Sequence, residues 1–209
     1  MPMNPQTEMG HEQKRRVSLG FGNLYASPGD HIGHFYRTSE EEKNVLIPFL
    51  KAGLKAREKC VCLISAGRRR QELQEGLTAA GIDAESALAS GQLVVDEGKS
   101  EPKELQEMLG KALEEIPEKF PLLRWAGVMS WALKKISTTE KLMEWETHCN
   151  TVESPAAVFL CQYELAMSGF HDAGLRRGSP SDGGNGNSRG RQAGLRERSP
   201  VMDVHDGDL

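Results

Sequence analysis

Short apolar runs alternate along the chain with longer segments in which apolar residues recur every three or four positions. The apolar runs predict five β-strands, at residues 31–36, 60–64, 92–96, 122–129 and 157–161. The intervening segments predict α-helices over residues 39–57, around Leu73 and Leu77, over 105–116 and over 137–152. Strands that alternate with helices favour right-handed βαβ crossovers. We therefore expect an α/β fold with a single, mainly parallel sheet and helices on both of its faces.

Capping and turn residues mark the ends of several of these helices. Ser39 and Glu42 have the spacing of a capping box at the start of the first helix, and Ser137 and Glu140 repeat it at the start of the last. Gly81 follows the second helix and tolerates the left-handed conformation that often ends a helix.

Regular periodicity is confined to the middle of the chain. Residues 1–28 are polar and predict a flexible N-terminal arm, in which residues 17–25 could add a short strand. Residues 29–170 carry all the elements described above and predict one domain. Residues 171–209 are rich in glycine, serine, arginine and aspartate. They predict a disordered tail, because such a segment cannot bury enough apolar surface to offset its ordering entropy.

The composition and charge of the chain argue against nucleic acid and membranes as binding partners. A chain of 209 residues with 38% hydrophobic content can form one sizeable core. Its net charge of −4 leaves no basic footprint, so we expect no direct binding to nucleic acid. No apolar run approaches the roughly 18 to 20 residues that span a bilayer, and the N-terminus lacks a hydrophobic signal core. We expect a cytoplasmic protein without a membrane partner, whose four cysteines are buried free thiols.

One segment has some likeness to a phosphate-binding loop. Gly98, Lys99 and Ser100 follow an apolar strand and precede a helix, but Leu93 stands where the first glycine of such a loop belongs. Asp96 and its neighbouring glutamate would also repel a polyphosphate. The sequence has no Gly-x-Ser-x-Gly nucleophile elbow either. We expect no catalytic residues, and a protein that is not an enzyme.

The histidines and cysteines do not form an evident metal motif. His31 and His34 lie three residues apart on a predicted strand, so their side chains point to opposite faces unless the backbone turns at Gly33. Cys60 and Cys62 share a strand face, but no Cys-x-x-Cys or spaced histidine pair completes a tetrahedral set. Core packing explains the two thiols more simply, and we expect neither a metal nor a cofactor.

Polar aromatic side chains gather in the first predicted strand. His31, His34 and Tyr36 lie just before the first helix begins. Ligands of open α/β sheets bind at the carboxyl ends of the strands, where this helix starts. The residues alone leave two alternatives of equal weight, a ligand site and an edge strand with half-exposed polar groups.

Six segments, in order, resemble the MEDS domain, the sensory domain named after methanogens, methylotrophs and the DcmR regulator. They are HIGHFY (31–36), PFLKAGL (48–54), AAGID (79–83), ASGQL (89–93), MSWAL (129–133) and LCQY (160–163). The resemblance covers about residues 29–170. It implies a RecA/KaiC-like fold that has lost its phosphate loop and serves as a ligand-sensing module in bacterial and archaeal signalling.

The resemblance also implies where a ligand would bind. It points to His31, His34 and Tyr36 on the first strand, to Trp131 after the fourth, and to Tyr163 at the end of the last.

Two features depart from the family pattern. Family members often carry a glutamate where this chain has Val128, which removes a carboxylate from the expected pocket, and the segment over 96–102 is shorter than usual. Many members are fused to a DNA-binding or kinase domain that this sequence does not show. We therefore expect the output to pass through a separate signalling or transcription-regulating protein.

Three hypotheses follow. The first is a non-catalytic cytoplasmic sensor that binds an unidentified small organic ligand at the carboxyl edge of its sheet. The second is a degenerate RecA-like module used only for protein–protein assembly. The third is a nucleotide-dependent enzyme.

Overall fold

The computed structural model describes residues 15–65, 68–129, 138–151 and 156–165. Its centre is a five-stranded sheet in which every pair of neighbouring strands is parallel. The strands are β3 (His31–Tyr36), β4 (Lys59–Ile64), β5 (Leu93–Glu97), β6 (Leu123–Val128) and β7 (Ala157–Glu164), in the spatial order β3-β7-β6-β4-β5. The predicted α/β class and the five predicted strands are confirmed.

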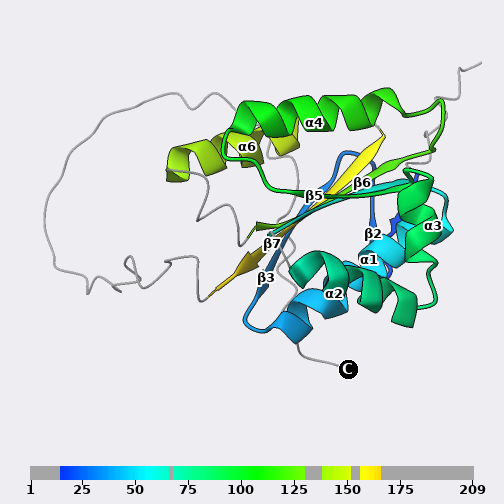
Figure 1. Cartoon of the computed structure of the whole chain (residues 1–209). Coiled ribbons are helices and arrows are strands. Elements are labelled where there is room, and N and C mark those ends of the chain that lie inside the picture. Colours follow the sequence, from blue (N-terminus) through cyan, green and yellow to red (C-terminus); the bar gives the residue numbers. More distant parts are fainter. Residues whose placement is uncertain (1–14, 66–67, 130–137, 152–155, 166–209) are drawn as a thin grey trace, which may run out of the picture.

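Helices cover both faces of the sheet, as predicted. The helices α1 (Ser39–Lys55), α2 (Arg68–Ala79) and α3 (Ala84–Ala89) lie on one face, and α4 (Pro102–Glu114) and α6 (Thr139–Thr151) lie on the other (Figure 1). Each face has its own hydrophobic cluster. Successive side chains of a strand alternate between them, because side chains in a strand point to opposite faces. Every residue of β4 is buried, as expected of an interior strand covered on both sides.

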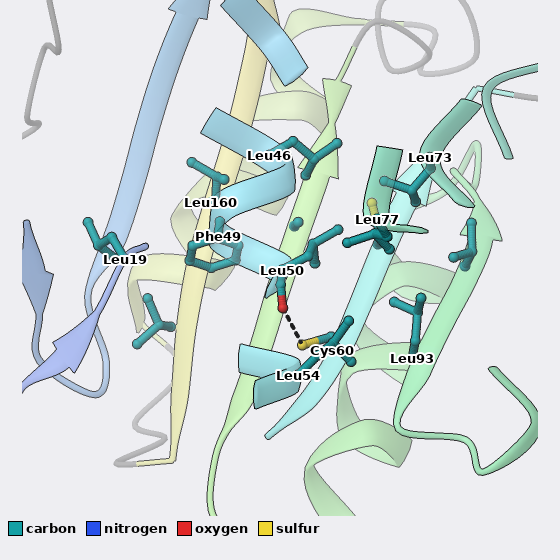
Figure 2. Packing of buried hydrophobic residues seen from close by; sticks show 14 of the residues in the cluster. Leu19, Leu46, Phe49, Leu50, Leu54, Cys60, Leu73, Leu77, Leu93 and Leu160 are labelled. Atoms are coloured by element: carbon teal, nitrogen blue, oxygen red, sulfur yellow. Dashed lines mark hydrogen bonds between the residues drawn. The ribbon is translucent and has the colours of Figure 1, made fainter. Parts of the chain in front are cut away.

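The cluster beneath α1 and α2 is the larger of the two. Phe49 and Leu50 of α1 are fully buried, with Phe49 beside Leu160 of β7 and Leu50 on the side toward Leu77 of α2 (Figure 2). Cys60 points into this cluster, with its sulfur 3.9 Å from the carbonyl oxygen of Leu50. Cys60 and Cys62 are free thiols in the same cluster, so their predicted shared face and buried state are confirmed. Burial raises the pKa of Cys60 to about 12.

The capping box of α1 lies one residue earlier than predicted. Thr38, not Ser39, is the N-cap: its hydroxyl accepts from the amide of Glu41 at 3.2 Å, and the Glu41 carboxylate accepts from the amide of Thr38. Glu42, the predicted partner, is buried and paired with Arg69 instead. Two overlapping capping patterns were available, and packing turned the second glutamate inward.

Two other predicted helix ends can be compared. Gly81 follows α2 with a φ of 81°, the left-handed conformation that was expected. Ser137 lies outside the described residues, and the hydroxyl of Thr138 accepts from the amide of Lys141 at 3.3 Å at the start of α6.

The described part of the expected flexible arm is a small hairpin packed on the core. Strands β1 (Val17–Ser18) and β2 (Tyr25–Ala26) pair in antiparallel fashion, and Leu19 between them is buried in the α1-side cluster. Gly20 has a φ of 87°, and a Cβ atom at this position would come within 2.2 Å of the Pro48 carbonyl oxygen. The apolar residues of this segment therefore pack on the α1-side cluster, and Gly20 lies against Pro48 and Ala52 of α1. Residues 1–14 of the arm lie outside the described part.

Two further expectations concern the rest of the chain. Within the described ranges, no helix is long and apolar enough to cross a membrane. The predicted disordered tail, residues 171–209, lies outside these ranges.

Candidate functional site

The first and last strands of the sheet lie side by side and bring the predicted residues together in two groups. His34 is in register with Gln162, and Phe35 with Tyr163. Residues in register on parallel strands point to the same face, so Tyr163 and Tyr36 point to opposite faces. The expectation that Tyr163 shares a pocket with His34 and Tyr36 is therefore wrong.

One group lies under α1 and α2, and we call it the α1-face cluster: His34, Tyr36, Glu42, Arg69 and Gln162. The Gln162 amide nitrogen donates to the carbonyl oxygen of Glu42 at 3.1 Å and lies 2.8 Å from Nδ1 of His34. The Glu42 carboxylate accepts from Arg69 at 2.7 Å. His34, Tyr36, Glu42 and Gln162 are all buried. The cluster is a buried polar network at the carboxyl end of β3.

Burial and neighbouring charges raise the pKa values of Tyr36 and Arg69 in this cluster. Burial, and then the nearby Glu42 carboxylate, raise the pKa of Tyr36, so its phenol is neutral at physiological pH. Burial opposes the charge of Arg69, but the attraction of Glu42 outweighs it and raises the pKa of Arg69. The cluster therefore presents a neutral hydroxyl beside a partly exposed cation that is paired with Glu42.

The α1-face cluster has hydrogen-bonding capacity that the described residues do not use. Oε1 of Gln162 is buried and makes no hydrogen bond within the described part of the chain, and the buried Tyr36 hydroxyl, although close to Glu42 and Arg69, makes none of normal geometry there. Leaving a buried polar atom unpaired costs about 1–3 kcal/mol. A ligand or a water that paired with both atoms would recover this free energy.

The space beside the cluster is small. A cavity of about 20 Å³ lies between α1 and α2 and is lined by Glu42, Lys43, Leu46, Ile47, Ile64, Arg69, Glu72 and Leu73. That volume holds about one water molecule. A larger hollow of about 270 Å³ lies near the end of α1 and beside α3, with Leu54, Asp83 and Gln92 in its lining. Of the predicted site residues that the structure describes (His31, His34, Tyr36 and Tyr163), none lines either cavity.

The second group lies under α6, and we call it the α6-face cluster: His31, Glu146, Asn150, Cys161 and Tyr163. Nε2 of His31 is 3.2 Å from Oε2 of Glu146, and Nδ1 is 3.1 Å from Oδ1 of Asn150. The Tyr163 hydroxyl donates to the other carboxylate oxygen of Glu146. His31 and His34 thus point to opposite faces, as predicted.

Sequence reasoning missed Glu146 and Cys161 as site residues. Glu146 lies next to Trp145 on α6, and charges beside an apolar stripe are usually solvated. The register of β7 against β3 reveals Cys161, which pairs with Gly33 and lies two residues before Tyr163 on the same strand face, whereas Glu146 is brought to His31 by the docking of α6 on the sheet.

Two other expected features can be located. Val128 is buried and in register with Gln162, so the family's usual glutamate would lie beside the α1-face cluster and this chain has an apolar side chain there. Trp131 lies outside the described residues.

The structure offers little support for phosphates at the two places where a loop could cradle them. Strand β5 ends at Glu97, directly before the lookalike segment, and the Lys99 ammonium is 3.4 Å from the Asp96 carboxylate. The connection from β3 to α1 has two residues, and the first turn of α1 carries three glutamates. Negative charge at a helix N-terminus competes with a phosphate for the same backbone amides.

Comparisons with known proteins agree with this architecture. The KaiC-like protein PH0186 from the hyperthermophilic archaeon Pyrococcus horikoshii OT3 has a similar structure, with a TM-score of 0.56 and 16% sequence identity over 72% of each chain. At this identity the similarity shows the fold alone, which is RecA/KaiC-like. No significant match was found among curated proteins. The family model described as the methanogen/methylotroph, DcmR sensory domain matches residues 30–177, so the chain belongs to the MEDS family.

Proposed function

We propose that the chain is a cytoplasmic, non-catalytic sensory module that binds a small organic ligand at the α1-face cluster and acts through a separate signalling protein. Membership of a sensory-domain family supports the sensory role. The observation that supports the site is the buried Oε1 of Gln162, which has no hydrogen-bond partner among the described residues, beside the Tyr36 hydroxyl at the carboxyl edge of the sheet.

The cluster restricts the chemistry of the ligand. The Tyr36 hydroxyl can donate a hydrogen bond, Oε1 of Gln162 can accept one, and Val128 offers an apolar contact nearby. A small molecule with one acceptor, one donor and a short apolar part would satisfy all three. A polyphosphate fits poorly, because three glutamates lie in the first turn of α1.

Ligand entry requires a change between α1 and α2. The cavity holds about one water molecule, and the Arg69–Glu42 pair lies in its wall. A ligand that displaces Arg69 from Glu42 would separate the two helices, whose outer surfaces are available to a partner. Binding would then shift the population between a closed and an open arrangement of α1 and α2.

The assembly hypothesis has one observation in its favour. Strand β3 is an edge strand of the described sheet, and the Phe35 ring at its end is 39% exposed and stacked on Tyr163. An exposed strand edge with an aromatic side chain can pair with a second chain.

A thermal-shift screen of the full chain tests the proposal. The panel contains small alcohols, amides and carboxylic acids, together with nucleotides. A compound that binds only the native state raises the melting temperature. Tyr36→Phe removes one hydroxyl and should weaken binding of a hit about tenfold, whereas Tyr163→Phe on the opposite face should not.

Three results would count against the proposal. A hit that binds Tyr36→Phe as tightly as the wild type would move the site elsewhere. Tight ATP binding that Lys99→Ala abolishes would support the enzyme hypothesis. Silence across the panel, with self-association in sedimentation that a charged substitution at Phe35 abolishes, would favour assembly.

A further inference from the structure

We propose that the α6-face cluster is a zinc site in which His31, Glu146 and Cys161 supply the ligands. One potential ligand atom from each residue lies within 4.8 Å of the other two. The three residues come from β3, α6 and β7, so the fold and not a local sequence motif brings them together. This inference is independent of the sensory proposal, because the α6-face cluster lies on the opposite side of the sheet from the α1-face cluster.

The spacing of the ligand atoms is close to that of a tetrahedral site. Bond lengths of about 2.0–2.2 Å to nitrogen and oxygen place two such ligand atoms roughly 3.4 Å apart. Nε2 of His31 and Oε2 of Glu146 are 3.2 Å apart. The longest separation allowed by the 4.8 Å limit exceeds the tetrahedral value by only about 1 Å, which side-chain rotation can close.

Hydrogen bonds from Asn150 and Tyr163 orient the proposed ligands His31 and Glu146 so that Nε2 and Oε2 face the metal position. Oδ1 of Asn150 accepts from Nδ1 of His31, which leaves the lone pair of Nε2 facing Glu146. Nε2 is buried and makes no hydrogen bond of normal geometry within the described residues. Tyr163 donates to Oε1 of Glu146 and leaves Oε2 available. Metal-binding histidines and carboxylates are commonly held by such outer hydrogen bonds.

A lone pair that faces a carboxylate oxygen at 3.2 Å is repulsive unless a cation lies between them. A proton on Nε2 would be one solution, and it would give an imidazolium–carboxylate pair. A divalent ion is the other, and the neighbouring Cys161 favours it because its thiolate is a zinc ligand; in a proton-bridged pair the neutral thiol would instead donate a hydrogen bond to Glu146.

Charge balance and burial are consistent with zinc. Cys161 is fully buried, and the side chains of His31 and Glu146 are 8% and 17% exposed. A zinc ion with one thiolate, one carboxylate and a neutral imidazole has no net charge, which lowers the cost of burying it. Nitrogen and sulfur ligands select zinc over magnesium or calcium. Three protein ligands leave the fourth position for water or an exchangeable anion.

Cobalt titration of the metal-free full chain tests this inference. Co²⁺ replaces zinc in tetrahedral sites, and a thiolate ligand gives a charge-transfer band in the near ultraviolet. We expect the band to saturate at one cobalt per chain, with intense visible bands of four-coordinate cobalt, and zinc to remove both. Cys161→Ser should lose the charge-transfer band, whereas Cys62→Ser, a buried thiol on the other face, should keep it.

A second variant tests the metal site without removing a proposed ligand, in case Cys161→Ser fails to fold. Asn150→Ala retains every proposed ligand and should weaken cobalt binding about 10-fold to 100-fold, as expected for removal of an outer partner. Zinc should raise the melting temperature of the wild type but not that of Cys161→Ser. The inference is overturned if the wild type gives no charge-transfer band and no zinc-dependent stabilisation, or if Cys161→Ser retains the band.

Discussion

Replacing Arg124 by methionine should destabilise the fold more than any exposed charge change. Arg124 is only 1% exposed, in the middle of the α1-side core. Its guanidinium donates to the Glu58 carboxylate, to the carbonyl oxygen of Phe49 at 3.1 Å and to that of Ser18 at 2.7 Å. One side chain therefore joins β6, α1 and the N-terminal hairpin.

The expected cost follows from what the substitution leaves behind. Methionine keeps much of the apolar stem but removes the charge, and the side chain of Glu58 is 5% exposed. The other cation close to Glu58 is Arg15, 4.0 Å away and about half exposed. Breaking a buried pair by removing one partner costs about 3–5 kcal/mol. Replacing Glu58 by glutamine as well should recover part of this, and leave about 1–3 kcal/mol from the two unpaired carbonyl groups.

Chemical denaturation at neutral pH measures these values, provided that the denaturant m-values agree between variants. Lys119→Met is the matched control, because Lys119 forms an exposed pair with Glu115 and its side chain is 65% exposed. The control should change stability by less than about 1 kcal/mol. A loss below about 1 kcal/mol for Arg124→Met, or a double variant less stable than Arg124→Met alone, would refute the role assigned to this pair.

Three further predictions concern the core and the termini. Cys62→Ser should cost about 1–3 kcal/mol more than Ser65→Ala, because it buries a hydroxyl in β4, and equal denaturation midpoints would contradict this. Burial raises the pKa of the Cys60 thiol to about 12 in the folded protein, whereas in the unfolded chain the thiol titrates near pH 8.5. As the pH rises above about 8.5, the unfolded chain loses the thiol proton while the folded protein keeps it, so the free energy of unfolding falls. Cys60→Ala should therefore lose less stability than the wild type between about pH 8 and pH 10 in denaturation experiments, and equal slopes would refute this. Deletion of residues 178–209, which follow the family match, should leave the melting temperature within a few degrees, and a larger loss in a thermal scan would show that the tail contributes to the core.

Much of the fold could be predicted because local patterns report burial. The nearly continuous apolar run over 60–64 is β4, which is buried along its whole length, and the stripe through Leu105 and Leu109 is the buried face of α4. The start of α1 at Ser39 was predicted correctly, but its N-cap was placed one residue late, because Thr38 and Ser39 are each followed three positions later by a glutamate. Sequence alone could not show which glutamate turns inward.

The N-terminal hairpin shows a different limit. Residues 17–26 are rich in apolar side chains but show no sustained periodicity, so the sequence predicted at most a short strand there, and β1 and β2 have two residues each. Contacts with the rest of the chain hold the hairpin in place: the Arg124 guanidinium donates to the Ser18 carbonyl, and Gly20 lies close to Pro48. Contacts between residues so far apart in the sequence leave no local signal.

In the candidate site, side-chain alternation within one strand could be predicted from the sequence, but the alignment of one strand against another could not. Alternation along one strand correctly separated His31 from His34, but the face of Tyr163 relative to Tyr36 depends on how β7 aligns with β3. A shift of one residue in that alignment would exchange the faces. Glu146 could not be predicted at all, because only the docking of α6 on the sheet turns it toward His31.

Alternation along β7 also makes the two proposals separable by experiment. Gln162 faces the α1-face cluster, whereas its neighbours Cys161 and Tyr163 face the α6-face cluster. A substitution on one face removes no contact on the other, so effects at sites without shared partners should be independent. Tyr36→Phe should therefore weaken binding of an organic ligand and leave cobalt binding unchanged. Asn150→Ala should weaken cobalt binding and leave binding of the organic ligand unchanged. If both variants impaired both measurements, the changes would reflect a general loss of structure around β7, and neither site would be supported.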